Sequence, residues 1–151
     1  PPCRRGRGVR RAGARALLLD TRARVWLVGG DERLAEPARD AVLAVAGRNA
    51  LRRSIVSVWE VGLLVAKGRL ALRRPCLEWV RAPLARSGVA PAPITPEIAV
   101  ERHRLPGGLH ADPADRLIVA TARAESASLV ARDRLILDHA RGGVHLSVLP
   151  C

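Results

Sequence analysis

The sequence has no phenylalanine, tyrosine or methionine, and its only aromatic residues are three tryptophans. Leu, Val, Ile and Ala must therefore form the core, and an apolar content of 48% in 151 residues suffices for one packed domain. Cys3, Cys76 and Cys151 are too few and too scattered for a disulfide framework or a zinc site, and the four histidines show no ligand spacing. We therefore expect a reducing, cytoplasmic setting.

Long uncharged runs are also missing. The early apolar stretch ALLLDTRARVWLV is interrupted by Asp20, Arg22 and Arg24, which argues against a signal-peptide core. No charge-free run approaches the ~18 residues that a membrane-spanning helix needs. We expect no membrane span.

Positive charge comes almost entirely from arginine, because Lys67 is the only lysine, and the net charge is +12. Residues 1–15 hold six arginines and no acid, so removing them leaves +6. We predict a basic, disordered arm over residues 1–15 and one domain over 16–151. The charge favours an anionic partner such as nucleic acid. Two plainer explanations stay open: the base content of the genome can account for a composition rich in Arg and Ala, and the arm can be an upstream extension without a role.

Strand and helix signals alternate along the chain. Short apolar or β-branched runs predict strands at 16–19, 54–58, 90–94, 128–131 and 144–149. Apolar residues at helical spacing, with Pro, Thr or Gly at the ends, predict helices at 24–30, 36–47, 59–68, 76–88, 95–105, 113–125 and 134–141. Continuous apolar strands are typical of a parallel sheet covered on both faces. We predict a three-layer α/β/α sandwich around a central, mostly parallel sheet of about five strands.

Four acids fall at one edge of this predicted sheet, where open α/β proteins bind their ligands. Asp20 ends the first strand, and Asp133 follows the strand 128–131 after one residue. Glu60 and Asp115 lie in the first turns of predicted helices, and Asp115 shares a helix face with apolar residues.

Each acid also has a structural explanation. Asp112 precedes Pro113 and is first of all a helix N-cap, and Asp133 can cap the last helix. Glu60 and Asp115 suit the helix dipole. Asp20 alone gains nothing from capping if the turn continues through Arg22. Clustered carboxylates repel one another unless a cation neutralises them, and an all-oxygen ligand set favours Mg²⁺ or Mn²⁺.

Five motifs, in order, resemble the PIN-domain ribonucleases and most of all the VapC toxins of toxin–antitoxin pairs: LLLDT, SVWEVGLLVAKGRL, ITPEIAV, HADPADRLIVATA and ARDRLIL. The resemblance extends from about residue 16 to residue 151. It implies that an acidic quartet holds the metal, with a further candidate in Asp112, which matches an Asp common in a DPxDR variant of the family. The quartet is Asp20, Glu60, Asp115 and Asp133.

The resemblance implies a Mg²⁺-dependent endoribonuclease, with Mn²⁺ as an alternative ion. Arginines would hold the RNA backbone, the metal would orient a water for in-line attack, and Asp133 would help to deprotonate that water. Two positions depart from the family pattern. Arg22 stands where His is frequent, and Ala131 replaces a Thr near the metal.

The resemblance also implies two protein partners, an antitoxin and a second copy of the chain. In the related toxins, helices corresponding to residues 58–70 and 76–89 form a groove for an antitoxin segment. The apolar residues of these helices are either part of that groove or plain core, and for most of them core is the simpler interpretation. They are Trp59, Leu63, Leu64, Trp79 and Leu84.

Two other functions remain as alternatives. A phosphoacceptor signalling domain also gathers acids at strand ends, but it needs a lysine after a late strand, and Lys67 lies on an early helix. A catalytically weak or inactive PIN-fold protein that binds RNA or an antitoxin would retain the same acids. The sequence does not identify the RNA target or the antitoxin.

Overall fold

The structure is a computed structural model that describes residues 15–46, 48, 50–86, 89–109, 112–142 and 145–151. Residues 1–14 of the predicted basic arm lie outside this range. The described strands are β1 (Leu17–Leu19), β2 (Leu51–Ser54), β3 (Val89–Ala92), β4 (Ser128–Ala131) and β5 (Val148–Pro150). The described helices are α1 (Thr21–Gly29), α2 (Glu36–Val45), α3 (Ile55–Ala66), α4 (Cys76–Arg86), α5 (Pro96–Glu101), α6 (Pro113–Ala124) and α7 (Arg134–Arg141).

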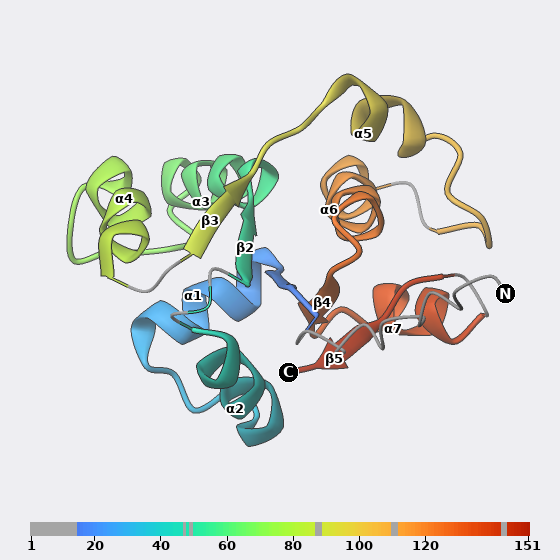
Figure 1. The fold of residues 1–151 in the computed structure, drawn as a ribbon. Helices are drawn as coiled ribbons and strands as arrows, with labels where there is room; N and C mark the ends of the chain where they lie inside the picture. Colours follow the sequence, from blue (N-terminus) through green and yellow to red (C-terminus); the bar gives the residue numbers. More distant parts are fainter. Residues whose placement is uncertain (1–14, 47, 49, 87–88, 110–111, 143–144) are drawn as a thin grey trace, which may run out of the picture.

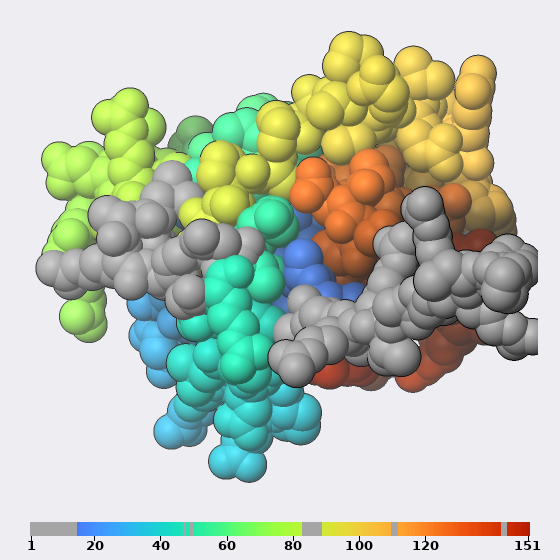
Figure 2. Space-filling view, in the orientation of Figure 1, coloured from blue at the N-terminus to red at the C-terminus, as the bar shows by residue number. Residues whose placement is uncertain are grey.

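All five strands form one parallel sheet in the order β3-β2-β1-β4-β5. The predicted fold class is therefore confirmed. β1 lies at the centre, where Leu18 pairs with Arg52 on one side and Leu129 on the other. In the space-filling view its blue atoms show only as a small patch between neighbouring segments, as expected for a covered central strand (Figure 2).

Two apolar clusters cover the two faces of the sheet (Figure 1). Leu17 and Leu19 pack with residues of α1 and α2, whereas Leu18 packs with residues of α5, α6 and α7. Successive residues of a strand point to opposite faces, so three consecutive leucines serve both layers. No helix in the described part of the chain is long and apolar enough to cross a bilayer.

The prediction of a strand at 54–58 is wrong. β2 is Leu51–Ser54, and the β-branched run that follows is the start of α3. The Ser54 hydroxyl accepts a hydrogen bond from the backbone N–H of Val56 at 3.1 Å and so caps the helix. A short apolar run does not separate a strand from a buried helix, and here the cap and the tertiary packing decide. Glu60 consequently lies in the second turn of α3, not the first.

The other boundaries differ by smaller amounts. α1 begins at Thr21 and ends before Gly30, whose φ of +64° is the left-handed conformation that glycine adopts readily. α5 ends at Glu101, earlier than predicted, and β5 begins only at Val148. β4 and α7 match their predicted ranges.

Candidate functional site

The carboxyl ends of the parallel strands, and the helix N-termini beside them, carry the predicted site residues. Asp20 directly follows β1, and Asp133 follows β4 after one residue. Asp112 and Asp115 lie at the N-terminus of α6, and Glu60 lies on α3. α3 and α6 lie next to each other, as the contacts between them and Figure 1 show.

Asp20 is the most buried of these acids, with 6% of its surface exposed. Its carboxylate accepts a hydrogen bond from the backbone N–H of Ala23 at 2.6 Å, so Asp20 is the N-cap of α1. The expectation that Asp20 gains nothing from capping is therefore wrong, because α1 begins immediately after it. Burial raises the pKa of Asp20 to about 6, against the lowering effect of hydrogen bonds from the backbone of Ala23 and Arg132 and of the charge of Arg22. The charge of Glu60 raises it further.

Glu60 accepts a hydrogen bond from the hydroxyl of Thr21, the residue next to Asp20. Burial raises the pKa of the Glu60 carboxyl, and the charge of Asp112 adds to this effect. Arg22 lowers it, as it does for Asp20, so one exposed guanidinium acts on both carboxylates. Thr21 was not singled out from the sequence, and its only signal was its place in the LLLDT motif.

Asp112 is the N-cap of α6, as predicted. Its carboxylate accepts hydrogen bonds from the backbone N–H groups of Ala114 at 2.9 Å and Asp115 at 3.1 Å. Arg116 fixes the segment before the cap, because it donates to the backbone carbonyls of Arg102 at 2.9 Å and Leu109 at 2.6 Å. Asp115 itself is half-buried in the first turn of α6.

Asp133 is the N-cap of α7 and accepts a hydrogen bond from the backbone N–H of Leu135 at 2.8 Å. Cys151, after β5, also belongs to this edge of the sheet. Burial raises the pKa of the Cys151 thiol to about 12, and the charge of Asp20 contributes to the rise. Sequence reasoning did not find this proximity, since nothing local connects residue 151 to residue 20.

The charge of Glu60 acts on Asp20, and the charge of Asp112 acts on Glu60, so these three carboxylates belong to one electrostatic neighbourhood. No three carboxylate, imidazole or thiol groups in the described ranges are close enough to form a ready-made metal group. Mg²⁺ does not require one, because it is usually held by one or two carboxylates and retains several waters and substrate oxygens. Asp20, which is buried, and Glu60, which is half-buried, offer the oxygen ligands that a divalent cation prefers. The assignment of Asp20, Glu60, Asp115 and Asp133 to a metal site stays a prediction.

Comparison with known proteins assigns this chain to a family. The chain matches the PIN domain over residues 17–142 and belongs to the PIN domain family. It is 33% identical over 123 residues to Ribonuclease VapC22 of Mycobacterium tuberculosis, which covers 82% of this chain and 91% of that protein. The resemblance found in the sequence motifs is thus confirmed.

Solved structures share the fold at low sequence identity. VapBC2 from Rickettsia felis, bound to a DNA fragment from its promoter, superposes with a TM-score of 0.66 at 18% identity over 90% of this chain and 98% of that chain. A toxin–antitoxin complex from Klebsiella pneumoniae gives a TM-score of 0.59 at 21% identity over 89% of this chain and 96% of that chain.

The raised pKa of Asp20 predicts the pH dependence of stability in the metal-free protein. Between pH 3.8, its ordinary pKa, and about 6, the folded state keeps a proton that the unfolded chain has lost. The free energy of unfolding therefore falls as pH rises through this window, by roughly 3 kcal/mol in total for the shift from 3.8 to about 6, and this contribution is constant above it.

Urea unfolding at a series of pH values, with a chelator present, measures this slope. Asp20→Asn keeps the capping oxygen and should remove the part of the fall that Asp20 causes, leaving the part that comes from the raised pKa of Glu60. An unchanged slope in Asp20→Asn would show that Asp20 is not the titrating group.

Proposed function

We propose that this chain is a Mg²⁺-dependent endoribonuclease, the toxin component of a toxin–antitoxin pair. The observation that supports it most is the buried Asp20 carboxylate beside Glu60, at the strand ends of a PIN domain. The ribonuclease name of the M. tuberculosis relative and the toxin–antitoxin complexes among the structural neighbours agree with it. Mn²⁺ is the alternative ion.

Asp20 and Glu60 would hold the cation, with Asp115, Asp133 and Asp112 as the further candidates. The bound ion would supply Lewis-acid polarisation of the scissile phosphodiester and would lower the pKa of a bound water. Arg22 is exposed and acts electrostatically on both carboxylates, so it is placed to contact a phosphate oxygen of the RNA backbone. Asp133, beside the same strand edge, would accept the proton of the attacking water at a carboxylate oxygen.

Ala131 is fully buried at the end of β4, and its methyl side chain offers no hydroxyl to the site. Thr21 offers one nearby, and it orients Glu60 by donating to its carboxylate. An inactive PIN-fold protein that only binds RNA or an antitoxin would retain the same contact, so the cleavage assay below separates the two functions. The cytoplasm is the proposed location, because there the RNA and an antitoxin partner would both be met.

We also propose a homodimer that forms through α3. Ile55, Trp59 and Leu63 are 44%, 60% and 37% exposed and follow one another at intervals of four residues, so they form one apolar stripe on that helix. The interpretation of Trp59 and Leu63 as core residues is therefore wrong. Trp79 is half-buried, and the side chain of Leu84 lies outside the described set.

RNA cleavage in the presence of Mg²⁺ tests the proposed activity. Asp115→Asn should lower cleavage by at least ~100-fold, the scale expected when a well-placed electrostatic group is lost. The metal-free Asp115→Asn protein should be as stable as wild type or more so, because one repelling charge is gone. Excess EDTA should abolish cleavage by the wild type, and cleavage that survives it would refute the metal mechanism.

One further variant serves as the control in this assay, and another tests whether Asp112 is a cap or a metal ligand. Asp138→Asn alters an exposed ion pair with Arg141 on α7 and should leave cleavage unchanged. Asp112→Asn should also keep both stability and activity if Asp112 is only a cap, since Asn caps nearly as well as Asp. Loss of activity in a folded Asp112→Asn protein would move Asp112 into the metal shell.

Light scattering at micromolar concentration tests the dimer. Trp59→Glu places a charge in the α3 stripe and should yield a monomer that keeps its fold. Leu77→Glu is the control. Leu77 lies on α4 and is 58% exposed, about as much as Trp59, and this variant should remain dimeric. A wild-type chain that is strictly monomeric would contradict the proposal.

A further inference from the structure

The ring of Trp26 on α1 is in contact with two arginine side chains from different segments. Arg33 comes from the connection between α1 and α2, and Arg132 comes from the loop between β4 and α7. The guanidinium carbon of each lies over the ring, 5.3 Å from its centroid. Trp26 is only 8% exposed, because it packs in one of the two apolar clusters of the sheet. The face of an indole ring attracts cations, so a fixed ring holds both guanidinium groups in place.

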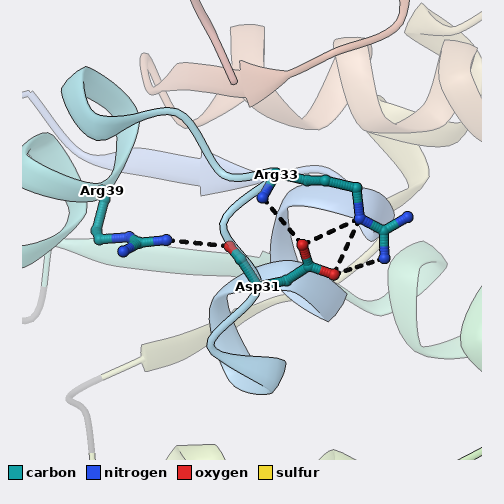
Figure 3. A network of polar contacts seen from close by, with 3 residues as sticks. All are labelled: Asp31, Arg33 and Arg39. Atoms are coloured by element: carbon teal, nitrogen blue, oxygen red, sulfur yellow. Dashed lines mark hydrogen bonds and ion pairs between the residues drawn. The ribbon is translucent and has the colours of Figure 1, made fainter.

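Arg33 is already neutralised by Asp31 (Figure 3). Its Nε donates to both carboxylate oxygens of Asp31 at 3.0 Å, and its backbone N–H donates to Oδ1 at 2.9 Å. The backbone of Asp31 is fixed as well, because its N–H donates to the carbonyl of Trp26 at 2.9 Å and its carbonyl accepts from Arg39 at 3.0 Å. The hydrogen bonds from Arg33 lower the pKa of Asp31 to about 2, so this pair carries no net charge at neutral pH.

Arg132 keeps a positive charge that no acid of the described ranges neutralises. Its side chain is exposed, and its guanidinium forms no ion pair with a described residue. The ring of Trp26 offers no oxygen acceptor, so the N–H donors of Arg132 remain available to an anion from outside the chain. The two arginines on the ring thus differ in what they can bind.

Arg132 lies next to the candidate site in a specific way. It stands between β4 and Asp133, and a hydrogen bond from its backbone acts to lower the pKa of the Asp20 carboxyl. Its guanidinium, in contrast, lies over Trp26. Burial raises the pKa of the Cys151 thiol, and the charge of Arg132 acts against this rise. An anion bound by Arg132 would therefore lie beside the acids of the strand ends, not among them.

We propose that Arg132 binds a backbone phosphate of the RNA other than the scissile one, and that Trp26 is the residue that positions it. The inference deepens the proposed function and rests on it for the identity of the substrate. A guanidinium binds phosphate through paired N–H groups in a planar fork, and a fork that is held in place before binding loses less freedom when the phosphate arrives. Arg33 cannot serve in this way, because Asp31 occupies its donors.

Binding of a short, fluorescein-labelled single-stranded RNA to the full chain in EDTA, followed by fluorescence anisotropy at a series of KCl concentrations, tests the phosphate contact. Arg132→Gln should weaken binding by roughly 10-fold at low salt, the effect of one hydrogen-bonded charge. It should also reduce the slope of log K against log salt concentration by ~0.7, the value for one phosphate contact on a single strand. Arg33→Gln removes the same charge from the same ring and should leave affinity and slope nearly unchanged.

The same titrations test Trp26 as a positioning residue. Trp26→Leu keeps the charge of Arg132 but removes the ring beneath it, so affinity should fall by about 3-fold while the salt slope stays that of wild type. Trp26→Phe retains a ring face and should restore most of the affinity. If Trp26→Leu does not fold, Trp26→Phe and Arg132→Lys decide the result. Arg132→Lys keeps the charge without the planar fork and should bind between wild type and Arg132→Gln, with the wild-type slope.

Four results would overturn the proposal. They are a wild-type chain that does not bind RNA, an unchanged slope in Arg132→Gln, an equal loss of affinity in Arg33→Gln, and a Trp26→Phe protein that binds no better than Trp26→Leu. An equal loss in Arg33→Gln would mean that only net charge matters. The measurement contains no metal ion and no cleavage step, so its failure is separate from failure of the ribonuclease activity.

Discussion

The burial of one carboxylate, that of Asp20, is the constraint on which the site depends. The side chain ends the central strand of the sheet, caps α1 through the N–H of Ala23, and lies beside Glu60 on α3. Its position joins three elements, because β1, α1 and α3 all meet at this residue or its neighbour Thr21. Burial raises the pKa of this carboxyl to about 6, so keeping it ionised above that pH is a cost to the folded state. A divalent ion would remove this cost.

Opposite charges are separated within the chain, and this separation suits one type of substrate. The whole sequence carries +12, while the carboxyl ends of the strands gather acids. Positive surface charge would attract a phosphate backbone and the acids at the strand ends would accept a metal ion, so this distribution of charge agrees with the proposed cleavage of RNA.

Local signals in the sequence predicted the parts of the fold that depend on local chemistry. Asp112 followed by Pro113 predicted the start of α6, and the strand 128–131 with the helix 134–141 matched their observed ranges. The strand at β2 was misplaced because it contains Arg52 and Arg53, whereas the apolar run after it forms a helix. Arg53 is tolerated in a buried strand because its guanidinium reaches the carbonyl of Val80, 27 positions away, and no local pattern reports such a partner.

Asp20 and Asp133 were found from the sequence as strand-end residues, and in the structure they follow β1 directly and β4 after one residue. The contacts of these acids with distant residues could not be predicted from the sequence. The hydrogen bond between Thr21 and Glu60, for example, joins residues 39 positions apart. The same holds for Arg24 and Arg53. The sequence gives no sign that the fold buries these two arginines near each other.

Binding of Mn²⁺ to the RNA-free protein, followed by the electron paramagnetic resonance signal of the free ion, measures the central claim most directly. At about pH 8, well above the pKa of about 6 for Asp20, the account predicts saturable binding by the wild type. Glu60→Gln should weaken it by at least ~10-fold, the effect of roughly 1.4 kcal/mol, whereas Glu97→Gln, an exposed acid on α5, should leave it unchanged. No saturable binding by the wild type, or equal binding by Glu60→Gln, would contradict a metal site at the end of β1.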